Sequence, residues 1–358
     1  EITTRLVGSE MCIRDRFYSM ADTIIVGKFV GTKALAAVGS TGTIMFLING
    51  FILGMTAGFT VLTAQKFGAG DMKAMRKTVG NAAILAIIMS LIMTVLGMMA
   101  MKPLLGIMKT PDDIFKDAYA YIMVICGGIA AQMLYNFLSS VLRALGNSKV
   151  PLYFLILAAL LNIVLDMVFI IAFHMGAAGA AWATVISQGI SGILCLLYIA
   201  KKVPALYLHR EDWEIDKNLA GWQLKIGLPM AFQYSITAIG TIVVQSCLNI
   251  LGSTAAAGFA AASKIEQVFT QAYVALGTTM ATYCAQNMGA GKYTRIRKGF
   301  KSATLIGFIY AVVTGVIIFF VGKYMTIFFV SENVNQIMEY VDIYLRCCLL
   351  YTSPSPRD

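Results

Sequence analysis

The chain has 358 residues, of which 58% are hydrophobic and only 13% are charged. Soluble globular domains carry about 25% charged residues, so the composition excludes a soluble enzyme, a DNA-binding module and a disordered protein. With about 20 apolar residues needed for each membrane span, the length allows about ten membrane helices.

The two ends differ from the rest of the chain. Residues 1–16 have no apolar helical stripe, and residues 347–358 contain two prolines and several polar turn formers. Both segments resemble translated adapter sequence of the kind found at the ends of assembled reading frames. We therefore expect both to be foreign to the native protein, which would be cut at both ends. The alternative is a cytoplasmic targeting tail.

Apolar runs bounded by charged residues, Gly or Pro follow between these ends. They lie at about 17–28, 34–64, 79–101, 117–141, 151–173, 177–200, 223–249, 254–287, 298–322 and 336–346. The longer runs indicate tilted helices or helices that extend past the bilayer. The sequence therefore predicts an all-α, polytopic membrane protein.

Basic residues are concentrated in every second loop. The loops after the second, fourth, sixth and eighth runs carry most of them, including Lys66, Lys73, Arg76, Lys77, Arg143, Lys149, Lys201, Lys202 and those at 292–301. Basic loops face the cytoplasm. The net charge of +10 is thus a topology signal, and no nucleic-acid partner is expected.

Motifs for enzyme chemistry are missing from the sequence. The seven cysteines include no CxxC pair, and two histidines are too few for a His-based metal cluster. There is also no P-loop, no GxGxxG after a strand and no GxSxG, so nothing predicts ATP hydrolysis, an enzyme or a cofactor.

An internal repeat appears when the chain is shifted by 221 residues. The pattern AQxxGAG at 64–70 matches 285–291, residues 31–36 align with 252–257, and Tyr119-x-x-Ile122 matches Tyr340-x-x-Ile343. Six spans in each copy keep the two copies in one orientation, as in parallel-repeat transporters. We expect two pseudo-symmetric six-helix lobes, with about ten of the twelve helices present.

The repeat suggests domain bounds. The first lobe, with helices 1–6, is predicted at 17–200. A cytoplasmic linker, solvated around 213–217, is predicted at 201–222. The second lobe, with helices 7–10, is predicted at 223–346.

Two acidic residues stand out inside apolar runs, where a charge costs about 2.5–3.5 kcal/mol on insertion scales. Tyr18 precedes Asp22 by four residues, and Asn162 precedes Asp166 by four, so each pair shares a helix face. If these faces converge, desolvation and mutual repulsion disfavour two bare carboxylates, and the site can take up a proton or a small cation. The alternative is that each Asp only bonds a neighbouring helix.

Other polar residues add to this picture. The sixth run contributes Thr184, Ser187 and Gln188, and the eighth run contains Glu266. Glu266 is either a structural partner or a contact for cargo or an ion. Gln188 and Glu266 are candidates for a substrate cavity, and the only metal considered is sodium at Asp22 and Asp166.

These motifs resemble those of the multidrug and toxic compound extrusion (MATE) transporters. The resemblance covers about 17–346 and is carried by 18–27, 34–39, the AQxxGAG motif, Leu142-Arg-Ala-Leu-Gly146 with Pro151, Asn162-x-x-x-Asp166 and 176–184. This sequence departs from the family at Ser19, where the family often has Asn. It also departs in helix 7, which lacks an acid that some branches use for sodium.

The resemblance implies a secondary antiporter with two lobes around a central cavity. Such a protein expels cationic and amphipathic compounds in exchange for protons or sodium ions by alternating access. The coupling residues implied by position are Tyr18, Asp22, Asn162, Asp166 and Thr184. We expect a monomer in the bilayer of the bacterial cytoplasmic membrane.

Two other functions fit the sequence less well. A lipid-linked oligosaccharide flippase of the same superfamily would need a cationic cavity for pyrophosphate, and the central spans hold only Lys264 and Arg346. A receptor or scaffold gives no reason for a duplicated six-span unit with buried acids.

Overall fold

The computed structural model describes residues 32–108, 110, 112–250, 253–322, 324, 338 and 341–345, and its regular elements are all helices. The chain divides into two compact units. The first contains Glu1–Ala238 and Ala281–Ile296, and the second contains Ile239–Met280 and Arg297–Asp358. The first unit thus combines the predicted first lobe with the first half of one later helix and the end of the next.

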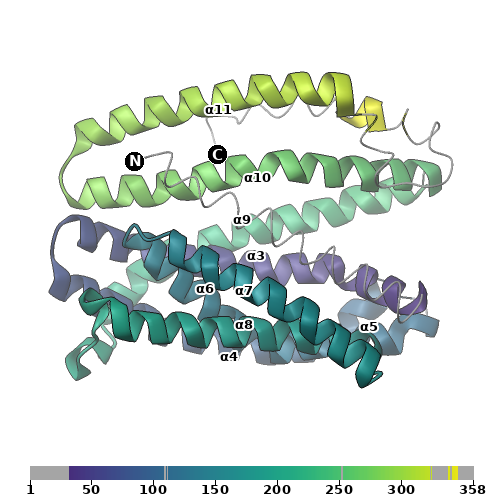
Figure 1. The fold of residues 1–358 in the computed structure, drawn as a ribbon, viewed down its shortest axis with the longest axis horizontal. Helices are drawn as coiled ribbons and strands as arrows, with labels where there is room; N and C mark the ends of the chain where they lie inside the picture. Colours follow the sequence, from purple (N-terminus) through teal and green to yellow (C-terminus); the bar gives the residue numbers. More distant parts are fainter. Residues whose placement is uncertain are drawn as a thin grey trace. The chain divides into compact units, whose positions relative to one another are not determined.

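Helices follow one another along the whole described chain (Figure 1). They are α3 (Thr32–Gly68), α4 (Met72–Ile107), α5 (Asp112–Gly127), α6 (Ile129–Ala144), α7 (Lys149–Asp166), the π-helix η1 (Met167–Ala172), α8 (Gly176–Lys202), the short 3-10 helices η2 (Pro204–Leu206) and η3 (Arg210–Trp213), α9 (Lys217–Ile250), α10 (Ser253–Gly289) and α11 (Tyr293–Val321). Within the first unit, α8 packs against α5, α6 and α7.

The prediction of a polytopic membrane protein is confirmed. Among the described residues, five helices are long and apolar enough to cross a membrane, and a sixth span is formed if the bent pair α5 and α6 counts as one. The predicted run at 117–141 is not one straight helix, because it bends by 47° between Gly127 and Ile129. Adjacent glycines at 127 and 128 lower the helix propensity there.

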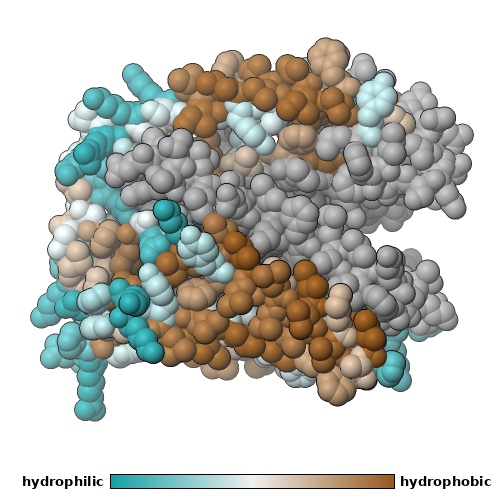
Figure 2. All heavy atoms as spheres, in the orientation of Figure 1, coloured by the Kyte–Doolittle hydropathy of each residue, from teal (hydrophilic) through white to brown (hydrophobic). Residues whose placement is uncertain are grey.

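The helices turn apolar side chains outward as well as inward. On α4, Leu91 is 60% exposed and Met99 is 73% exposed, which would be costly in water but suits contact with lipid tails. Figure 2 shows apolar side chains over the middle of the helices and hydrophilic side chains gathered mainly at the left of the view.

Glycines on α3 bring α9 into close contact within the first unit. Gly54 lies against the backbone of Ala231, and Gly58 lies against Gly227, so closely that a Cβ on either α3 glycine would overlap α9. Glycines four residues apart allow such backbone approach between membrane helices. The first half of α9 is therefore held against α3.

The two AQxxGAG copies form the same turn. The amide of Ala69 donates to the carbonyl of Gln65 at 2.9 Å, and that of Ala290 donates to Gln286 at 3.0 Å. The glycines at 70 and 291 have φ of 76° and 67°, the left-handed conformation that ends helices. The repeat predicted from the sequence is present in the local structure.

Candidate functional site

The acidic residue predicted in the fifth span lies in the interior of the first unit. Asn162 and Asp166 are both fully buried on α7. Asp166 is the last residue of α7, and the chain continues as the π-helix η1. Because π-helical turns are rare and frequently occur at functional sites, this change of winding at Asp166 marks the position.

A polar face of α8 lies opposite. The amide of Asn162 donates to the hydroxyl of Thr184 at 3.4 Å, a long hydrogen bond between two buried side chains. The hydroxyl of Ser187 donates to the carbonyl of Thr184 at 3.0 Å. The Oδ1 of Asn162 has no hydrogen-bond partner among the described residues, so it can accept from a proton carrier or bind a cation.

The structure thus brings together part of the predicted coupling set. Asn162 contacts Thr184, and Asp166 follows Asn162 by one turn on the same helix face. Gln188 lies one turn beyond Thr184, half-buried, and its Oε1 has no hydrogen-bond partner in the described part of the chain. Tyr18 and Asp22 lie outside the described residues.

Oxygen atoms dominate this site. Among the described residues, no group of three or more His, Cys, Asp or Glu could hold a metal ion. The donors of Asn162, Asp166 and Thr184 are carboxylate, amide and hydroxyl oxygens, which suit a proton or a hard cation and not a soft transition metal.

Glu266, the second predicted cargo contact, belongs to the second unit. Its carboxylate accepts a hydrogen bond of 2.8 Å from the hydroxyl of Tyr344. The ring of Tyr344 packs edge-on against Phe259, with centroids 5.2 Å apart. The sequence reasoning missed Tyr344, because nothing local in the sequence pairs it with a residue 78 positions away.

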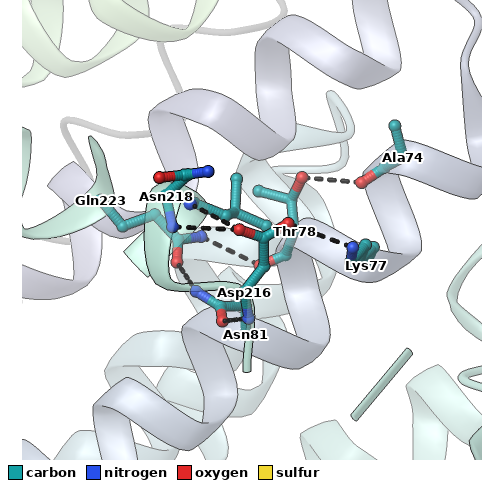
Figure 3. Close-up of polar contacts among 8 residues, drawn as sticks. Ala74, Lys77, Thr78, Asn81, Asp216, Asn218 and Gln223 are labelled. Carbon is teal, nitrogen blue, oxygen red and sulfur yellow. Dashed lines mark hydrogen bonds and ion pairs between the residues drawn. The ribbon is translucent and has the colours of Figure 1, made fainter. Parts of the chain in front are cut away.

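A second polar cluster joins α4 to the start of α9 (Figure 3). The side-chain amide of Asn81 donates to the side-chain oxygen of Gln223 at 2.7 Å. The side-chain amide of Gln223 in turn donates to the backbone carbonyl of Thr78 at 3.0 Å. Both amide side chains are fully buried. Asn81, Gln223 and Thr78 hold α9 against α4, and none of their side chains titrates.

Asp216 extends this cluster at the surface. It accepts from Lys77 at 3.1 Å and from the backbone amides of Asn218 and Leu219 at the start of α9. The Lys77 hydrogen bond, with these amides, holds the pKa of Asp216 below its usual value of 3.8. Of the residues in the predicted solvated linker, Trp213 is exposed and Asp216 is bonded to α4.

A family model and several named relatives match this chain. The MatE family profile matches residues 12–168 and 229–355. The protein named "probable multidrug resistance protein YpnP" of Bacillus subtilis is 33% identical over 318 residues, which cover 88% of this chain and 70% of that protein. A protein named "FAD transporter" of Shewanella oneidensis is 24% identical over 92% of this chain and 73% of its own length.

Solved structures agree on the fold. A multidrug resistance MATE family transporter in an outward-facing conformation superposes with a TM-score of 0.90 at 21% identity, covering 98% of this chain and 78% of that one. A transporter of the MOP superfamily from Pyrococcus furiosus, described as having a binding pocket of reverse polarity, gives a TM-score of 0.89 at 22% identity, covering 98% and 79%.

Proposed function

This chain belongs to the MatE family of membrane transporters, and from that premise we propose that it is a secondary active multidrug efflux antiporter. It would exchange protons or sodium ions for cationic or amphipathic organic compounds by alternating access. The proposal places it in the bacterial cytoplasmic membrane, since the relatives named above come from bacteria.

One observation carries the proposal. Asp166 is a fully buried carboxyl group in a membrane-spanning helix, beside the Asn162–Thr184 pair. An ionisable residue at such a position is costly and marks an ion or proton pathway. Uptake of a cation at Asp166, together with Tyr18 and Asp22 of the coupling set, would remove this cost and favour one facing of the transporter over the other.

The exchange of ion for cargo follows from this preference for one facing. A bound ion can shift the equilibrium between two facings only by its difference in affinity for them. The ion would bind the outward-facing state more tightly, displace the cargo there, and leave toward the cytoplasm. Asn162 and Thr184 would orient the carboxylate and supply further oxygen ligands.

Cargo contacts are proposed at Gln188 and Glu266. Glu266 combines a carboxylate with the aromatic rings of Tyr344 and Phe259. A negative charge beside aromatic rings suits an organic cation, which is attracted by both. Replacing Glu266 by Gln is expected to raise the ethidium concentration for half-maximal transport and to leave the ion dependence unchanged.

The alternative cargo is a lipid-linked pyrophosphate, moved by a flippase. Such an anion calls for basic side chains in the interior. Among the residues whose side chains the structure describes, which leave out Lys264 and Arg346, no Lys or Arg is fully buried, whereas Asp166 is. This favours a cationic cargo.

The test is transport in liposomes that contain the purified protein. Ethidium efflux should start when an inward proton or sodium gradient is imposed and stop when an ionophore abolishes it. FAD serves as the anionic comparison, because one relative carries that name. Movement of FAD without movement of ethidium, or efflux that ignores both gradients, would overturn the proposal.

A further inference from the structure

A stripe of polar side chains runs along α6. Its members are spaced by three or four residues, so they share one helix face: Gln132, Asn136, Ser139, Ser140 and Arg143. The remaining faces of α6 are apolar, with Met133, Phe137 and Leu138 in the core. The sequence reasoning did not detect this stripe.

Two buried members of the stripe have side chains without a hydrogen-bond partner in the described part of the chain. Gln132 is 1% exposed and Ser139 is fully buried. Among the described residues, the side-chain nitrogen and oxygen of Gln132 have no hydrogen-bond partner, and the hydroxyl of Ser139 has none either. Leaving such a group unpaired costs about 1–3 kcal/mol, and buried polar groups without protein partners are normally bonded by ordered water.

One end of the stripe lies level with the coupling site. Gly128, just before α6, packs against Val185 of α8, and Gly189 of α8 packs against Ala131 of α6. This register places Gln132 at the height of Gln188, one turn from Thr184. The bend at Gly128 lies at the same height, and breaks in membrane helices are tolerated where they line water or are covered by protein.

The other end of the stripe lies at the basic end of the bundle. Arg143, in the last turn of α6, donates to the hydroxyl of Ser140 at 2.8 Å. Lys149 begins α7 after the short loop that follows, and this basic turn is one of those assigned to the cytoplasm. The stripe therefore runs from the height of the coupling residues toward the cytoplasm.

We propose that the α6 stripe lines a file of water molecules that connects the Asn162–Asp166–Thr184 site with the cytoplasmic end of α6. The unpaired amide of Gln132 and the hydroxyl of Ser139 bond these waters. A proton or small cation released from Asp166 leaves along the file. Only this last role rests on the proposed function, since the waters would be present whatever the protein transports.

Access of a water-sized probe to single cysteines tests the file. In a variant whose seven cysteines are replaced by alanine, Ser139→Cys is compared with Leu138→Cys, its neighbour on an apolar face of α6. Silver ions are added to inside-out membrane vesicles, and thiols that remain are labelled with a fluorescent maleimide after denaturation. Thiols react as thiolates, which form in contact with water. The thiol of Ser139→Cys should therefore react with silver ions at least about tenfold faster than the thiol of Leu138→Cys.

A second pair of variants guards against misfolding. Asn136→Cys, on the stripe, is compared with Phe137→Cys, off the stripe, in the same assay. Equal rates within both pairs would show a dry stripe and overturn the proposal. Faster reaction of the stripe cysteines, reached from the cytoplasmic side, supports it even if the protein proves to have another cargo.

Transport by Gln132→Met then tests the role of the file. This change removes the amide at similar volume, so gradient-driven ethidium efflux should fall by about tenfold while ethidium binding is unchanged. Met133→Leu is the matched control on the same helix. A dry, merely unpaired Gln132 would give the opposite result: higher thermal stability and an unaltered rate, because an isosteric apolar group would remove a buried unpaired amide.

Discussion

Gly68 packs directly against the backbone carbonyl of Gln286, so closely that a Cβ atom would overlap its oxygen. The same relationship recurs between Gly289 and Gln65, which the 221-residue repeat aligns with Gly68 and Gln286. The end of α3 and the end of α10 therefore meet through a reciprocal pair of contacts. The side-chain amide of Gln286 also donates to the backbone carbonyl of Ala144 at 2.6 Å, and this bond holds the end of α6 at the same junction.

This junction predicts that alanine will not fit at either glycine. Gly68→Ala and Gly289→Ala should each destabilise the protein by about 1–3 kcal/mol, because a backbone carbonyl cannot move aside as a side chain can. Thermal melting in detergent measures the loss. Gly221→Ala on α9 is the control, since nothing lies within 4 Å of an added Cβ there. Equal melting temperatures for all three variants would contradict the close packing.

The buried amide pair of Asn81 and Gln223 predicts coupled effects of substitution. Asn81→Leu or Gln223→Leu alone should cost about 1–3 kcal/mol, because each leaves buried hydrogen-bonding groups unpaired. The double variant should lose less than the sum of the two single losses. Strict additivity in denaturation experiments would show that the pair in Figure 3 contributes no mutual stabilisation.

Asp216 predicts a pH-dependent contribution to stability. Its pKa is lowered in the folded protein, first by the Lys77 hydrogen bond, so the carboxylate form is favoured by folding. The stabilisation is full above the unfolded-state pKa of about 4 and is lost as the pH falls through the lower folded-state pKa. The difference in melting temperature between the protein and Asp216→Asn should therefore shrink from pH 7 to pH 3. A difference that stays constant would exclude this carboxylate as the cause.

Thr184 predicts a moderate effect on transport. Thr184→Val keeps the shape of the side chain and removes the hydroxyl that accepts from Asn162. A net hydrogen bond of about 1 kcal/mol corresponds to about a fivefold loss in ion-driven exchange. Ser90→Ala on α4, which removes a hydroxyl bonded only within its own helix, controls for loss of a buried hydroxyl. An equal loss in both variants would remove the special role of Thr184.

Much of the fold follows from patterns that are local in the sequence. Long apolar runs predict the helices, since the membrane offers the backbone no hydrogen-bond partner outside its own helix. The glycines at 70 and 291 indicate the turns. The bend at Gly128 was missed, because the apolar run continues through it without any charge or proline.

The candidate site, like the fold, was predictable only where the signal is local in the sequence. Asn162 and Asp166 could be identified because polar residues one turn apart in an apolar run are rare. Gln132 and Tyr344 could not, because their roles depend on which helix faces them and at what height. That register is set by close contacts such as Gly128 with Val185, which the sequence of one helix does not reveal.

The central claim is that the buried carboxyl group of Asp166 exchanges its cation for cargo. Its most direct test is ethidium efflux from liposomes containing Asp166→Asn, driven by an imposed proton or sodium gradient. Asp117→Asn on the exposed face of α5 is the matched control. We predict that Asp166→Asn abolishes the gradient-driven efflux and still binds ethidium, while Asp117→Asn transports normally. Efflux by Asp166→Asn at the rate of the unaltered protein would contradict the claim.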